Sequence, residues 1–210
     1  MRITLLTAFM FITGVASSVN ISVATMDSTQ SSTVEVTKVV DDFTNHNTLI
    51  TEKWRRWTTN NGRSGIGMFQ SYLNGNAKAL DLMGVQLIAF RIHYSGDLGC
   101  LSNSSSKMLV RLENGNVITL YHMGETDCDL DGQTGYYSPI KMENIENAKN
   151  LDDLQYDINE VLNALVESNV EKIRLVGSRS YTEQIPSSKH RMGNASAFFK
   201  EHIIAIRQYK

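Results

Sequence analysis

The chain has 210 residues, of which 41% are hydrophobic and 20% are charged. This is the composition of a globular protein and excludes a largely disordered chain. The formal net charge is −2 at pH 7, so the chain lacks the strong basic field with which proteins gather nucleic acid or anionic lipid. We therefore expect no nucleic-acid partner.

The N-terminal residues have the pattern of a secretory signal peptide. Arg2 is followed by an apolar run from Ile3 to Ala16, which is shorter than the roughly 20 residues that a membrane-spanning helix needs. We expect a signal peptide over 1–24 with cleavage near 16 or 24, a flexible leader over 25–33 and one domain over 34–210. The alternatives are an uncleaved membrane anchor and a buried N-terminal segment. The expected location is the periplasm or the cell surface, with no transmembrane span in the mature protein.

The first half of the expected domain is rich in strand patterns. Val34 to Val40 and Thr48 to Thr58 are predicted as early strands, and 85–94 is the clearest strand because apolar residues alternate along it. Lys107 to Leu112 and Val117 to Met123 also alternate, and the Asn-Gly pair between them is typical of a tight hairpin turn.

The second half contains two helix patterns and a further strand. Apolar residues recur at three- and four-residue spacing near 151–168, with Asn150 placed to cap the helix. Lys172 to Val176 is predicted as one strand of a pair, with Lys172 and Arg174 facing outward, and a C-terminal helix is expected near 196–207. The predicted fold class is α+β: an antiparallel sheet or roll with helices packed on it.

The two cysteines are placed symmetrically about the predicted hairpin turn. The midpoint of Cys100 and Cys128 is residue 114, within that turn. Because the hairpin arms bring residues at equal distance from the turn together, and exported proteins form disulfides, we expect Cys100 and Cys128 to be bonded.

The acidic segment around Cys128 is the motif that most clearly indicates a cofactor site. Asp127, Asp129 and Asp131 alternate and are followed by Gly132, like the first half of a calcium-binding loop. The twelfth position is Ser138, where such a loop carries glutamate. The segment therefore predicts either weak calcium binding or a solvated acidic turn, and no other cofactor.

The histidines do not form a diagnostic catalytic or metal-binding motif. His93 and His122 lie on strands that could be neighbours, but no zinc-protease, nucleophile-elbow or phosphate-loop motif is present. The default for each histidine is partial burial or exposure to solvent.

Four segments resemble uncharacterised exported proteins of Bacteroidetes: 39–44, 51–54, 111–120 and 171–178. The resemblance covers most of the expected mature chain in layout. It implies an envelope location in a Gram-negative cell, and it carries no activity and no catalytic residues. The sequence thus favours a non-catalytic exported module that binds an envelope protein or a glycan through a sheet edge or face. The alternative is a small exported hydrolase with a site assembled from distant residues, including His93, His122 and the acidic segment.

Overall fold

The computed structural model describes residues 34–40, 47–52, 55–58, 72–94, 98–124, 128, 133–186 and 195–209, with 55–58, 72–74 and 133–134 described by their backbone alone. The expected signal peptide and leader over 1–33 lie outside these residues. Asp127, Asp129 and Asp131 also lie outside them.

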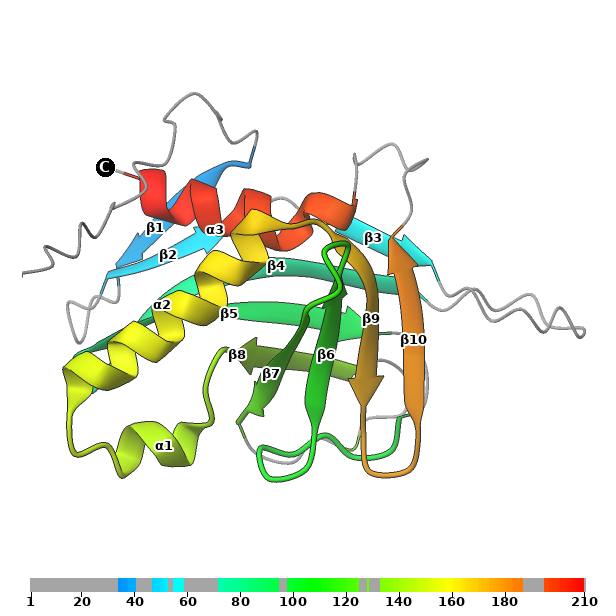
Figure 1. The fold of residues 1–210 in the computed structure, drawn as a ribbon, viewed down its shortest axis with the longest axis horizontal. Coiled ribbons are helices and arrows are strands. Elements are labelled where there is room, and N and C mark those ends of the chain that lie inside the picture. Colours follow the sequence, from blue (N-terminus) through cyan, green and yellow to red (C-terminus); the bar gives the residue numbers. More distant parts are fainter. Residues whose placement is uncertain are drawn as a thin grey trace, which may run out of the picture. The chain divides into compact units, whose positions relative to one another are not determined.

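Ten strands of the described residues form one antiparallel sheet (Figure 1). They are β1 (Val36–Val40), β2 (Asn47–Thr51), β3 (Arg55–Thr58), β4 (Tyr72–Leu82), β5 (Val85–Tyr94), β6 (Lys107–Leu112), β7 (Val117–Met123), β8 (Gln133–Ser138), β9 (Val170–Val176) and β10 (Tyr181–Pro186). The strand order is β1-β2-β4-β3-β10-β9-β6-β7-β8-β5, and β5 at its end also pairs with β4. The sheet therefore curls: β4, β5 and β8 run across Figure 1, whereas β6, β7, β9 and β10 run steeply.

Strand alternation divides the sheet into an inner and an outer face. On the inner face Phe90 lies opposite Tyr137, Tyr137 lies opposite His122, and Met108 lies opposite both Leu120 and Leu175. All of these side chains are almost completely buried. The inner face is therefore the floor of the hydrophobic core, and the intervening residues form the outer face.

Three helices lie within the described residues. They are α1 (Met142–Glu146), α2 (Leu151–Glu167) and α3 (Phe198–Gln208), the last preceded by a 3-10 turn, η1 (Ala195–Ala197). The Asn150 side chain accepts a 3.0 Å hydrogen bond from the Asp152 amide and so caps α2. Arg207 near the end of α3 donates to Asn163 of α2 at 2.9 Å, which joins the two helices.

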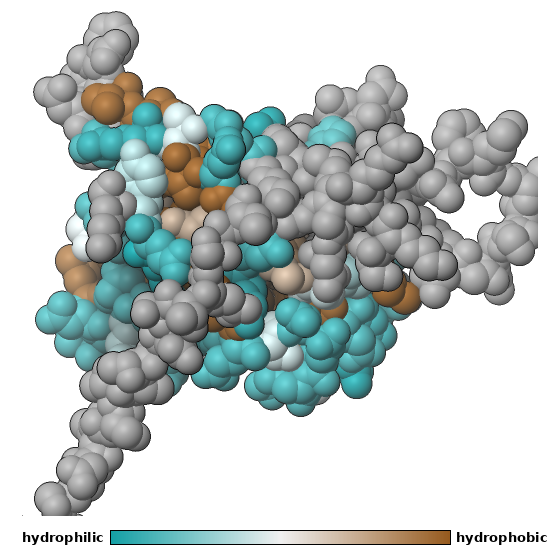
Figure 2. Space-filling model, turned by 90° about the horizontal axis from the view of Figure 1, so that it is seen from above, coloured by the Kyte–Doolittle hydropathy of each residue, from teal (hydrophilic) through white to brown (hydrophobic). Residues whose placement is uncertain are grey.

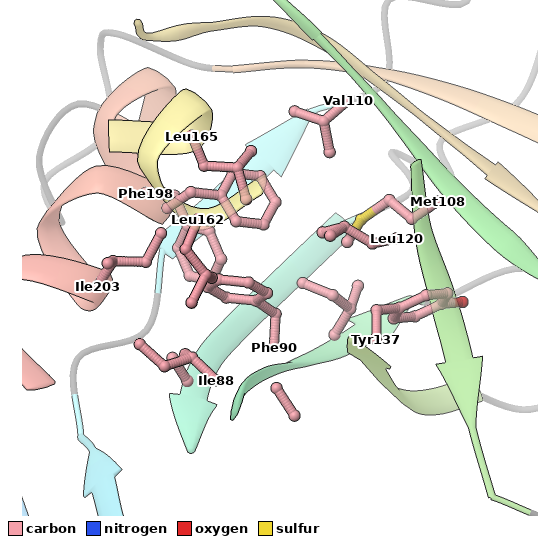
Figure 3. Close-up of a cluster of buried hydrophobic side chains, with 14 of the residues drawn as sticks. Ile88, Phe90, Met108, Val110, Leu120, Tyr137, Leu162, Leu165, Phe198 and Ile203 are labelled. Carbon is pink, nitrogen blue, oxygen red and sulfur yellow. The ribbon is translucent and has the colours of Figure 1, made fainter. Parts of the chain in front are cut away.

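Phenylalanine rings join the helices to the inner face (Figure 3). The centroid of Phe90 lies 4.7 Å from that of Phe199, and Phe198 lies 5.1 Å from Phe199, both edge to face. Leu162 and Leu165 of α2 lie over the same cluster. Edge-to-face aromatic pairs add about 0.5–1.5 kcal/mol each to the burial of their area, so this cluster fixes how α2 and α3 sit on the sheet.

β2 and β3 pair one after the other with the same edge of β4. A buried side-chain hydroxyl lies where the two strands meet along this edge. At this junction the Thr51 hydroxyl accepts from the Ala77 amide at 2.7 Å and donates to the Ala77 carbonyl at 3.0 Å. His202 Nδ1 of α3 lies 2.6 Å from the same oxygen. Because the hydroxyl has one hydrogen and Ala77 O accepts it, the geometry assigns the third contact to a donating Nδ1–H of His202.

The structure confirms the predicted α+β class, the hairpin and both longer helices. One strand prediction is wrong: Thr48 to Thr58 is two strands, β2 and β3, because the two segments pair with β4 in registers that differ by two residues. β4, β8 and α1 were not predicted.

Within the part of the chain that the structure describes, no helix combines the length and apolarity needed to cross a membrane. Viewed from above, the described surface is mostly hydrophilic with small hydrophobic groups between (Figure 2). The exposed apolar side chains of the described residues include Val39 and Val40 of β1 and Val117 of β7.

Candidate functional site

The outer face of β7, β6, β9 and β10 carries cationic, aromatic and apolar side chains on one surface. The register places Leu109 opposite Arg174, Arg111 opposite Lys172, and Arg174 opposite Glu183. We call this surface the basic face and define it by Lys107, Leu109, Arg111, Val117, Glu171, Lys172, Arg174, Tyr181, Glu183 and Ile185.

Arg174 is the centre of the basic face. Its Nε donates to Glu183 Oε1 at 2.9 Å, and its guanidinium lies 4.8 Å from the centroid of the Tyr181 ring. The hydrogen bond from Arg174 lowers the pKa of Glu183, and the same bond raises the pKa of Arg174. The guanidinium is thus held over the ring of Tyr181, a residue that is 62% exposed, so an aromatic surface and a charge are presented together.

A shallow hollow lies beside this pair. It has a volume of about 160 Å³ and is lined by Leu109, Arg111, Val117, Lys172, Arg174 and Glu183. Arg111 donates to Glu171 at 2.9 Å, with both side chains about half exposed. The hollow therefore has an apolar floor with cations at its rim.

The basic face has the opposite sign of charge to the chain as a whole. It carries four cations, Lys107, Arg111, Lys172 and Arg174, and two carboxylates, Glu171 and Glu183. Its formal charge is 4 − 2 = +2, whereas the whole chain carries −2. A partner with an acidic surface would therefore be attracted to this face over the rest of the molecule.

The predicted disulfide is confirmed. Cys100 and Cys128 are bonded, with Cα atoms 4.1 Å apart, and the hairpin pairs Lys107 with Tyr121, a register that is also centred on residue 114. The path to Cys100 is not a straight arm, since the Ser106 amide bonds Ser102 O in a turn. The bond is consistent with an oxidising compartment.

Cys100 is also fastened to the turn between β9 and β10. Its amide donates to Ser178 Oγ at 2.8 Å, and its carbonyl accepts from the Ser178 amide at 3.0 Å. Gly177 permits this approach, because a Cβ at residue 177 would lie 2.3 Å from Leu98 O. The disulfide thus connects Cys128 to the β9–β10 end of the sheet.

The structure does not bring the predicted histidines together. β8 separates their strands, and the register places His122 on the inner face and His93 on the outer face. Among the described residues no group of three or more His, Cys, Asp or Glu could hold a metal ion. The calcium site at Asp127, Asp129 and Asp131 stays a prediction.

Sequence reasoning found part of the basic face. The alternation along 172–176 indicated that Lys172 and Arg174 face outward, as the structure shows. Tyr181 and Glu183 were missed because β10 was not located. The sequence of β10 gives little signal for a strand, because its two buried residues, Thr182 and Gln184, are polar.

The chain has no significant match among protein-family models, curated proteins or solved structures.

Proposed function

We propose that the protein is an exported, non-catalytic binding module that holds an acidic segment of an envelope protein on its basic face. The observation that carries this proposal is the Arg174–Tyr181 stack, fixed by Glu183 and surrounded by exposed apolar and cationic side chains. Tyrosine and arginine are enriched in protein–protein interfaces and dominate their binding energy. Binding to the stack requires little loss of conformational entropy, because the strands and the ion pair already hold its side chains in place.

Two further features support a protein partner and export. Val117 and Ile185 expose apolar side chains, 56% and 41% accessible, at the borders of the basic face, and apolar area of this kind suits the core of a protein interface. The disulfide supports export, since such bonds persist in oxidising compartments.

The proposal is tested by site-specific photo-crosslinking in the native host. A photoreactive residue replaces Val117 or Ile185 of the full chain, and the same residue at Tyr156, which is exposed on α2, is the control. We expect one envelope protein to be crosslinked from both face positions and not from the control. Equal adducts from Tyr156, or adducts that are polysaccharide, would contradict a protein partner at this face.

The charge argument is tested on the purified partner. Arg111→Glu combined with Lys172→Glu should weaken binding by about tenfold or more, because like charges across an interface are strongly unfavourable. Lys38→Glu on β1 provides a matched reversal away from the face. Equal weakening by both variants would show that the basic face is not the binding surface.

A further inference from the structure

A second hollow on the outer face differs from the basic face in its chemistry. It has a volume of about 350 Å³ and is lined by Lys78, Leu80, Leu82, Met123, Tyr136 and Met142. These residues come from β4, the end of β7, β8 and the start of α1. The volume lies near the lower end of small-molecule sites, which are concave, mostly apolar and furnished with a few polar groups.

The hollow lies over the β4–β5 ladder. Lys78 lies opposite Ala89 and Leu80 lies opposite Leu87 across the β4–β5 ladder. Ala89 and Leu87 are 0% and 2% exposed, so the ladder beneath the lining residues is closed to solvent. Met123 and Met142 are unbranched thioethers that adapt to the outline of an aliphatic ligand.

Lys78 is the charged side chain among the lining residues. Its ammonium makes no hydrogen bond or ion pair with the described residues. The nearest acid along β4, Asp81, is already engaged: Oδ1 accepts from the Gly84 amide at 3.1 Å and Oδ2 accepts from Gln86 Nε2 at 2.7 Å. An apolar hollow with one uncompensated cation is complementary to an aliphatic chain that ends in one negative charge.

We propose that this hollow binds a free fatty acid, with the alkyl chain against Leu80, Leu82 and the two methionines and the carboxylate on the Lys78 ammonium. The site is separate from the basic face, so the two proposals stand or fall independently. The ligand would be a monomer held on the outside of the sheet, with its carboxylate at the half-buried lysine.

Calorimetric titration of the full chain with hexanoate, octanoate, decanoate and dodecanoate, each below its micellar concentration, tests the chain-length dependence. Burying a methylene is worth about a fourfold gain in affinity. We expect affinity to rise by about that factor per carbon until the hollow is filled. Decylammonium should bind at least about tenfold more weakly than decanoate, because its charge faces a lysine. Affinity independent of chain length, or equal affinity for both charges, would overturn the proposal.

The Lys78→Met variant keeps the aliphatic stem and removes the charge. It should weaken decanoate binding by about tenfold, whereas Lys38→Met on β1 should leave it unchanged. In methyl NMR spectra, decanoate should shift the signals of Met123 and Met142 and leave Met108, fully buried in the core, in place. Undiminished binding to Lys78→Met, or shifts at Met108 alone, would show that the ligand binds elsewhere.

Discussion

At the scale of single residues, the structure depends on the hydroxyl of Thr51, a residue that no sequence motif marks. Thr51 is one of many threonines, yet its Oγ1 satisfies both backbone groups of Ala77 and contacts His202 of α3. Asn76 reinforces the junction by donating to the Thr51 carbonyl at 3.0 Å. Buried backbone groups must be paired, so this side chain takes the place that a strand partner would otherwise fill.

Replacing Thr51 by valine keeps the shape of the side chain and removes the hydroxyl. We expect a loss of about 2–4 kcal/mol in the free energy of unfolding, because the Ala77 groups and His202 Nδ1 lose a buried partner. Urea denaturation measures it. Thr48→Val, in the same strand but only half-buried, should change stability by less than about 0.5 kcal/mol. Equal effects of the two variants would show that the hydroxyl bonds matter little.

The acidic segment around Cys128 gives a second prediction at this scale. With serine at the twelfth position, calcium binding by Asp127, Asp129 and Asp131 should be weak, with a dissociation constant of roughly 0.1–1 mM. Calcium at about 5 mM should then raise the melting temperature slightly, in line with a stabilisation of about 1–2 kcal/mol. The Asp129→Asn and Asp131→Asn double variant should lose the shift. An unchanged melting temperature in the wild type would mean a solvated acidic turn.

At the scale of elements, α2 protects the part of β5 that lies beyond β8. β8 pairs with residues 90–94 of β5, and at residue 86 the Gln155 side chain completes the edge. Its Nε2 donates to Gln86 O and its Oε1 accepts from the Gln86 amide, both at 2.8 Å. One amide side chain thus imitates a strand partner and joins the helix to the sheet.

The Gln155→Ala variant should lose about 1–2 kcal/mol, since two hydrogen bonds are removed but water can reach the site. Hydrogen exchange at the Gln86 amide should become faster than exchange elsewhere in β5. Asn159→Ala, one turn further along α2 and exposed, is the control. Unchanged exchange at Gln86 in the Gln155 variant would refute the bridging role.

Elements with a clean period could be predicted from the sequence, and those interrupted for packing reasons could not. β5, the hairpin, α2 and α3 each show their apolar period. β4 contains Gly75, where a Cβ would lie 3.0 Å from Phe198 Cζ, and β8 contains Gly135, where a Cβ would lie 2.8 Å from His122 Cδ2. Glycine usually marks a loop in a sequence, whereas here it makes room for a ring from elsewhere in the chain.

The candidate site, too, could be predicted from the sequence only in part. The outward direction of Lys172 and Arg174 was readable from alternation on one strand. The Arg174–Tyr181 stack depends on the pairing of β9 with β10, and the apolar hollow on the meeting of β4, β7, β8 and α1. Such long-range placement leaves no local pattern in the sequence.

At the scale of the whole molecule, the disulfide joins segments on both sides of the hairpin. Cys100 and Cys128 are 28 residues apart. Cys100 is also hydrogen-bonded to Ser178 in the β9–β10 turn. The bond restricts the unfolded chain and holds this end of the sheet together.

The Cys100→Ser and Cys128→Ser double variant should lose about 3–4 kcal/mol of stability, as chain-entropy arguments give for a loop of this length. Denaturation of oxidised wild type, reduced wild type and the variant measures it. Reduced wild type should match the double variant. A variant as stable as the oxidised protein would show that the loop is already ordered without the bond.

The helices and the sheet also separate charge across the fold. α2 exposes Asp152, Asp153, Asp157, Glu160 and Glu167 and contains no lysine or arginine. It packs on the inner face, while the basic face lies on the outer side of the same sheet. These two surfaces therefore carry opposite charge on opposite sides of the sheet. In the field of a negatively charged surface, their charges would turn the basic face toward that surface and α2 away from it, before any contact is made.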